Sequence, residues 1–102
     1  MSAPLTEAEF SKHLNTKFHL AGEAGVDLEL VEVKAYASQP HEHDGMERFS
    51  IFFIGPDKPF LQQKIYSFEH EQMGGMDLFL VPVAQEGSGI RYEAVFNYFK
   101  GR

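Results

Sequence analysis

Residues 76–97 read MDLFLVPVAQEGSGIRYEAVFN, two apolar runs on either side of a Gly/Ser segment. The alternation of large side chains predicts extended strands over residues 76–83 and 90–97. Between them, Gly87-Ser88-Gly89 predicts a tight turn, because glycine adopts the positive φ angles that hairpin turns require. This stretch therefore predicts an antiparallel β-hairpin. Apolar residues occupy both faces of its strands, although a strand with one buried face needs them on that face only.

Strand-like segments recur through the rest of the chain, separated by turns that contain glycine or proline. Regular spacing of this kind is typical of an antiparallel meander that closes or half closes. In one segment the alternation slips by one residue at Leu30–Val31, which predicts a β-bulge and a bend. We therefore predict a mainly β fold: about six antiparallel strands in a small barrel or folded-over sheet, with one short N-terminal helix. The expected elements are a helix over residues 7–14 and strands over residues 16–21, 26–36, 48–54, 64–70, 76–83 and 90–97.

A capping box indicates the N-terminal helix. Thr6 is followed three residues later by Glu9, and Leu5 and Phe10 occupy the positions of a hydrophobic staple. We expect this helix to lie across one end of the sheet. The alternation then predicts a core made of the inward-facing positions: Phe10, Phe18, Leu20, Leu28, Val33, Ile51, Phe53, Tyr66, Phe68, Leu78, Leu80, Tyr92, Ala94 and Phe96.

Length and composition restrict the class of protein. A chain of 102 residues predicts a single domain over residues 1–102. The formal net charge of −6, with the nine basic residues scattered, disfavours binding to a phosphate backbone, so we expect no nucleic-acid partner. The absence of cysteine excludes disulfides and thiol catalysis. No signal peptide or membrane span is recognisable, which predicts a cytoplasmic protein, or one incorporated in an assembly without a cleavable signal.

From Phe49 onward the chain resembles an uncharacterised family of small bacterial domains. The resemblance rests on FSIFFIGP at residues 49–56, on Leu61, Gln63 and Tyr66, on Leu78 to Val83, and on RYEAVFN at residues 91–97. Glu69-His70, the N-terminal Leu5, Thr6 and Phe10, and the strand from Leu30 to Val33 also resemble the family, so the resemblance covers most of the chain. The family implies no activity for this chain, and its members look like small accessory proteins. Some members are encoded near phage-tail-like or tail-collar fibre proteins, which implies a role in assembly.

One cluster of residues has the types found among metal ligands. His41 and His43 would project to the same side of an extended segment, and Asp44 could add an oxygen. However, Pro40 and Gly45 mark this segment as a polar loop, and no second ligand-bearing segment is evident. We therefore predict no metal and no other cofactor, and keep His41, His43 and Asp44 as the candidates to examine.

No catalytic constellation is recognisable. Glu69 and His70 are adjacent on a strand, so their side chains point to opposite faces. A histidine at the end of a strand more often bonds the backbone of the following turn. The serines lie in no nucleophile-elbow sequence. We therefore predict that the chain is not an enzyme.

The strongest indication of function is that some predicted strands carry more apolar side chains than one buried face needs. In residues 77–83 and 49–54, large apolar side chains occupy both faces of the predicted strands. One short helix cannot cover both, and an exposed apolar patch commonly marks a protein interface. Arg91 is either an interface anchor or half of a cross-strand ion pair on the solvated face. The candidate interface residues are Phe52, Ile54, Phe79, Val81, Arg91, Tyr98 and Phe99.

Two functions follow from these observations. The first is a non-catalytic protein-interaction or assembly module that binds a protein partner or forms a homo-oligomer, as a structural or accessory component of a phage-tail-like or fibre-type assembly. The alternative is a small-molecule-binding β-barrel whose pocket is lined by Phe18, Phe53, Tyr66 and Phe68. A barrel of six strands normally fills with its own side chains, which makes the alternative the weaker of the two.

Overall fold

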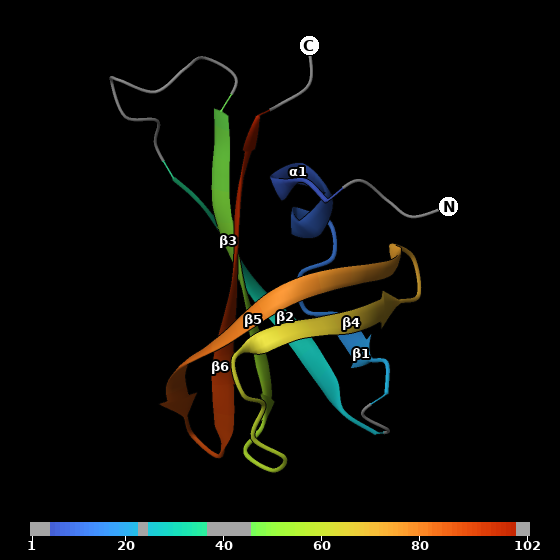
Figure 1. The fold of residues 1–102 in the computed structure, drawn as a ribbon, viewed down its shortest axis with the longest axis vertical. Helices are drawn as coiled ribbons and strands as arrows, with labels where there is room; N and C mark the ends of the chain where they lie inside the picture. Colours follow the sequence, from blue (N-terminus) through green and yellow to red (C-terminus); the bar gives the residue numbers. More distant parts are fainter. Residues whose placement is uncertain (1–4, 23–24, 37–45, 100–102) are drawn as a thin grey trace.

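A computed structural model gives the fold for residues 5–22, 25–36 and 46–99, and for residues 46, 47, 98 and 99 it describes only the backbone. These residues form helix α1 (Glu7–Ser11) and six strands: β1 (Lys17–Leu20), β2 (Asp27–Ala35), β3 (Met46–Pro56), β4 (Lys64–His70), β5 (Gly74–Glu86) and β6 (Gly89–Phe99). All the strand pairs are antiparallel, and the sheet closes in the order β1-β2-β3-β6-β5-β4 (Figure 1). The predicted fold class is confirmed, and the sheet is a closed barrel.

The β5–β6 hairpin forms as its sequence predicts, but its strands then separate. Gly87, with a φ of 59°, and Ser88 lie between the paired residues Glu86 and Gly89. The paired residues of β5 and β6 run only from this turn to the pair Val81–Glu93. Beyond it, β5 continues beside β4, whereas β6 continues beside β3, as Figure 1 shows. A register shift between Pro82 and Ala84, which was not predicted, lies shortly before the point where β5 turns away.

The bend in β2 lies where the sequence predicts it. The register between β2 and β3 shifts between Leu30 and Glu32, so that Val31 is the extra residue. The first half of β2 pairs with β1 up to Glu29, and the second half pairs only with β3. Val33 therefore lies where fewer strands surround it. It is half-buried against the core rather than fully inside it, as is Phe96.

The helix is shorter than predicted. Thr6 caps α1 by accepting a hydrogen bond from the N–H of Glu9 at 3.1 Å, as the capping box requires. The helix ends at Ser11 instead of Leu14, because the N–H groups of Lys12 and His13 bond to carbonyls three residues back. Asn15 then adopts a φ of 68°, which turns the chain into β1. One short turn of helix thus carries Phe10, fully buried, over one end of the barrel.

Aromatic rings fill the interior of the barrel. The Phe18 and Phe53 ring centroids are 5.3 Å apart, and those of Phe53 and Phe68 are 5.4 Å apart. Tyr92 is fully buried, and its hydroxyl accepts a hydrogen bond from the N–H of Leu61 at 3.0 Å. Twelve of the fourteen predicted core residues are buried, all except Val33 and Phe96, and the buried apolar set also includes Val26, Leu30, Phe49, Leu61, Met73, Met76 and Ile90.

Close packing at one point requires glycine. A Cβ atom on Gly55 would lie 2.3 Å from Cδ2 of Leu28, far inside van der Waals contact. Gly55 is itself buried and pairs with Ile90 across the β3–β6 ladder. The absence of a side chain here leaves the space that the end of the Leu28 side chain fills inside the barrel.

Candidate interaction surface

The outer face of β4 and β5 exposes large apolar side chains. Ile65 and Phe79 lie directly opposite each other in the β4–β5 ladder, and they are 65% and 49% exposed. Val81, half-buried, is two residues further along β5 on the same side of the strand. We call Ile65, Phe79 and Val81 the outer patch. Val81 pairs with Glu93 of β6, and Val95, two residues beyond Glu93, is 64% exposed.

Arg91 lies on β6 beside the apolar residues Phe52 and Ile54 of β3. Its guanidinium lies 4.5 Å from the ring centroid of Phe52 and 3.5 Å from the carboxylate of Glu86, and it also bonds Glu32. Arg91 thereby links β6 to β2, β3 and β5, which corresponds to the cross-strand alternative. It also covers part of Phe52, which is half-buried, as is Ile54.

Part-buried hydrogen bonds hold the carboxylate of Glu93 in place beside the outer patch. Ser50 faces the outside of β3 and yet is fully buried. Its hydroxyl donates to Oε2 of Glu93 at 2.6 Å and lies 2.9 Å from the Tyr36 hydroxyl. Sequence reasoning considered Ser50 only as a nucleophile and missed this role. The one available signal was a lone serine between apolar strand residues.

The remaining interface and metal candidates lie outside what the structure describes. His41, His43 and Asp44 fall in residues 37–45, which are not described, and the side chains of Tyr98 and Phe99 are not described either. Within the described part of the chain, no three His, Asp or Glu side chains lie together in a way that could hold a metal ion. These assignments stay predictions.

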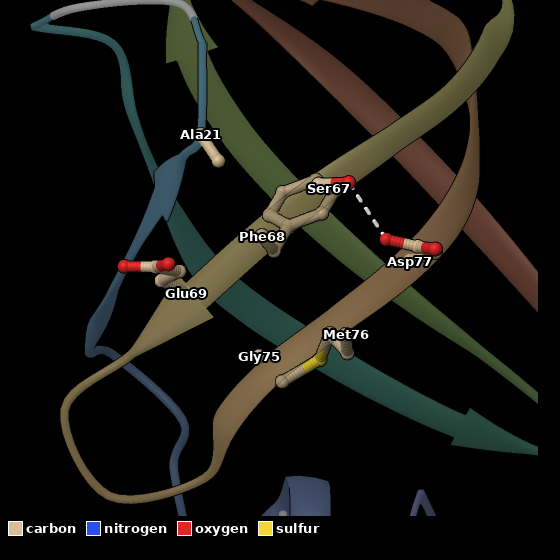
Figure 2. Close-up of a pocket in the computed structure, with 7 residues that line it drawn as sticks. All are labelled: Ala21, Ser67, Phe68, Glu69, Gly75, Met76 and Asp77. Carbon is tan, nitrogen blue, oxygen red and sulfur yellow. Dashed lines mark hydrogen bonds between the residues drawn. The ribbon is translucent and has the colours of Figure 1, made fainter.

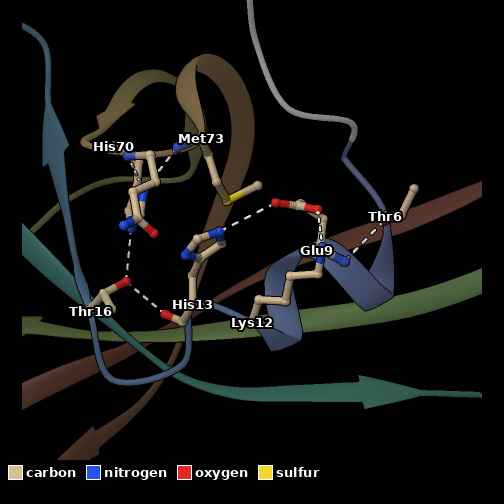
Figure 3. Close-up of polar contacts among 8 residues, drawn as sticks. Thr6, Glu9, Lys12, His13, Thr16, His70 and Met73 are labelled. Carbon is tan, nitrogen blue, oxygen red and sulfur yellow. Dashed lines mark hydrogen bonds and ion pairs between the residues drawn. The ribbon is translucent and has the colours of Figure 1, made fainter.

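His70 bonds to the backbone of the turn that follows it. Its Nδ1 accepts hydrogen bonds from the N–H groups of Gln72 and Met73 at 3.0 and 3.1 Å, and its Nε2 lies 2.9 Å from the Thr16 hydroxyl (Figure 3). The neighbouring Glu69 is exposed, on the opposite side of β4. This matches the interpretation of His70 as a turn-bonding residue. Both of its ring nitrogens take part in hydrogen bonds within the fold.

Burial lowers the pKa of His70 from its ordinary value of 6.5, because a charged ring is poorly solvated there. A positive charge on His13, whose ring centroid is 4.8 Å away, lowers this pKa further, and His19 acts in the same direction. Only Glu71 opposes them. The neutral form of His70 is therefore the one that the fold stabilises.

Two hollows open on the surface near these residues. One, of about 300 Å³, is lined by residues of β4 and β5 and by Ala21 (Figure 2). There Ser67 donates a hydrogen bond to Asp77 at 2.7 Å, so two of the polar side chains in the hollow bond each other. The other, of about 270 Å³, is lined by Thr16, Lys17, His19, His70 and the turn residues Glu71 and Gln72. Neither hollow is formed by the rings that the ligand-binding alternative assigned to a pocket, apart from Phe68.

Comparison with known proteins gives one match. Residues 5–96 match the family described as "Domain of unknown function (DUF6916)". The chain belongs to this family. The predicted resemblance to an uncharacterised family of small domains is thus confirmed for nearly the whole chain. No match was found among curated proteins or among solved structures.

Membership of DUF6916 assigns no activity to the chain, so the residues of its own surface are the guide to its function. No helix in residues 5–22, 25–36 and 46–99 is both long and apolar enough to cross a membrane. Two features of this DUF6916 domain bear on its function: the outer patch on β4 and β5, and the hydrogen-bonded histidine at the end of β4.

Proposed function

We propose that this domain is a non-catalytic protein-interaction module that binds another protein chain through the outer patch. The observation that carries the proposal is the pair Ile65 and Phe79, two large apolar side chains that face each other across two strands and are both about half exposed or more. Single exposed apolar residues are normal on protein surfaces, whereas adjoining ones on a rigid sheet favour an interface.

The rigidity of the patch supports this role. Both residues lie within the β4–β5 ladder, whose seven residue pairs run from Lys64–Leu80 to His70–Gly74. A backbone held in such a ladder loses little freedom when a partner binds, so more of the hydrophobic gain remains as affinity. Phe79 has the character of a central anchor residue, since aromatic side chains dominate the binding energy of many interfaces.

The interior of the barrel favours this function over the binding of a small molecule. The rings of Phe18, Phe53 and Phe68, which the alternative assigns to a ligand pocket, pack against one another. A six-stranded barrel filled in this way offers its outside, rather than its centre, to other molecules. The larger setting that we propose is a fibre or phage-tail-like assembly, in which the domain is a structural or accessory component. The family resemblance supports this setting.

Site-specific photo-crosslinking in the source organism tests the proposal. Benzoylphenylalanine replaces Phe79 in one version of the full chain and Ile65 in another. The matched control carries it at Lys34, an exposed position on β2. We expect a discrete crosslinked protein from positions 79 and 65 and none from position 34. The mass of the product distinguishes a second copy of this chain from a different protein. No product from either patch position, or equal products from all three, would contradict the proposal.

A further inference from the structure

Three segments meet at the end of the barrel that α1 covers. They are the turn after α1, the start of β1, and the turn between β4 and β5. Thr16 and His70, 54 residues apart in the chain, hold these segments together through the 2.9 Å contact between the Thr16 hydroxyl and Nε2 of His70 (Figure 3). Phe18 of β1 packs against the same ring at 4.3 Å between centroids.

The hydrogen bonds determine where the proton of His70 lies. Because Nδ1 accepts from two backbone N–H groups, it carries no hydrogen, and the single ring proton is on Nε2. Nε2 therefore donates to the Thr16 hydroxyl, and that hydroxyl donates in turn to the carbonyl of His13 at 2.6 Å. Each donor in this series of hydrogen bonds has one acceptor. All of these groups are therefore paired when the ring is neutral.

Protonation is incompatible with this arrangement. A proton on Nδ1 would place an N–H group against the N–H groups of Gln72 and Met73, and both hydrogen bonds to the turn would be lost. His70 is only 7% exposed and reaches water only where it lines the hollow beside Thr16, so water replaces the lost partners incompletely. The turn would have to move away for the ring to carry a charge.

The charges around His70 do not stabilise its protonated form. His13 follows α1 and its Nε2 lies 3.3 Å from Oε2 of Glu9, so the carboxylate of Glu9 faces His13 rather than His70. Lys12 bonds the other oxygen of Glu9 at 3.1 Å. Of the charges that act on His70 itself, His13 and His19 oppose a positive ring, and Glu71 on the exposed turn favours it. The titratable or charged groups on the elements around the ring are Glu9, Lys12, His13, Lys17, His19, Glu69 and Glu71.

We propose that His70 is an acid-sensitive latch. Its neutral ring fastens the turn between β4 and β5 to the chain between α1 and β1, and protonation of Nδ1 releases that turn. Met73, fully buried within the turn, becomes accessible when the latch opens. At the end of the barrel where α1 and β1 begin, the attachment of the β4–β5 turn therefore depends on pH.

The direction of the pH effect follows from the lowered pKa of His70. The unfolded chain binds this proton near pH 6.5, before the folded chain does, so acid favours opening. The latch makes its full contribution to the stability of the closed turn above pH 6.5. That contribution is lost as the pH falls from 6.5 through the lowered pKa of folded His70. Within that range, the equilibrium constant for closure falls by up to about tenfold for each pH unit.

The test is amide hydrogen exchange of Gln72 and Met73 in the full-length protein at pH 7 and pH 5.5, expressed as protection factors. In the wild type we expect protection at these two amides to fall by up to about tenfold per pH unit below 6.5. In His70→Asn, the side-chain oxygen can still accept from the turn but does not titrate, so protection should not depend on pH. The control His19→Gln removes an exposed histidine and should keep the wild-type loss.

Equal acid sensitivity in His70→Asn and the wild type would overturn the proposal. If His70→Asn does not fold, the imidazole nitrogen shifts of the wild type decide the question. The latch requires a neutral ring with its hydrogen on Nε2 at pH 7. A ring with its hydrogen on Nδ1, or a charged ring while Gln72 and Met73 remain protected, would also overturn the proposal.

Discussion

The two faces of β5 have similar side chains and opposite surroundings. Leu78 and Leu80 point into the barrel and are 3% and 0% exposed, whereas Phe79 between them points outward and is 49% exposed. Hydrophobicity alone does not distinguish these positions. What distinguishes them is architecture, because a closed barrel has one interior and therefore buries only every second residue of each strand. Apolar residues on the other face contribute little to folding and remain available for binding.

Matched alanine substitutions on the two faces should give the largest contrast. Phe53→Ala should lower the free energy of unfolding by about 3–5 kcal/mol, because it leaves a cavity between the fully buried rings of Phe18 and Phe68. Phe79→Ala should cost less than about 1 kcal/mol, since half of the ring already contacts water. Urea unfolding measures both. A similar loss for the two variants would contradict the distinction between the faces.

Alanine substitutions at two glycines test how tightly the interior of the barrel is packed. Gly55→Ala should destabilise the domain by about 1–3 kcal/mol, because the new methyl group would overlap Cδ2 of the fully buried Leu28 and force that side chain to repack. Gly75→Ala is the control, because its Cβ would meet its nearest neighbour at an ordinary 3.8 Å. Thermal unfolding of both variants provides the comparison. If Gly55→Ala were as stable as Gly75→Ala, the interior would be looser than the ring contacts indicate.

A serine pair tests the polar contacts on the outer face. Ser50→Ala should cost about 1 kcal/mol or more, since Glu93 and the Tyr36 hydroxyl lose a buried partner. Ser67→Ala removes a hydrogen bond of similar length to Asp77, but in an exposed position, and should change stability by less than about 0.5 kcal/mol. Chemical denaturation at pH 7 compares them. A larger loss for Ser67→Ala would mean that burial does not govern these contacts.

Local sequence patterns predicted most of the architecture. The hairpin over residues 76–97, the bulge at Val31 and the cap at Thr6 each depend on a few consecutive residues, and each is present. The interpretation of His70 as a turn-bonding residue succeeded for the same reason, because its partners Gln72 and Met73 are two and three residues away.

Predictions were incomplete where distant segments meet. The end of α1 depends on Asn15, whose N–H bonds the carbonyl of Leu30 on the bulge of β2. Arg91 meets Glu32 across 59 residues, and Ser50 meets Glu93 across 43. Such pairs depend on which strands become neighbours, and alternation along one strand carries no information about that. The degree of burial of Val33 depended in the same way on where β1 ends relative to β2.

The central claim is that the outer patch binds another protein chain, and the size of the native complex tests it most directly. The double variant Ile65→Ser/Phe79→Ser replaces two exposed side chains and should unfold at nearly the wild-type temperature. Gel filtration of gently lysed cells of the source organism, with detection of this chain, then gives its native size. We predict that the wild type elutes in a larger complex and the double variant as the free chain. Elution of both as free chains, or of both in the same complex, would contradict the claim.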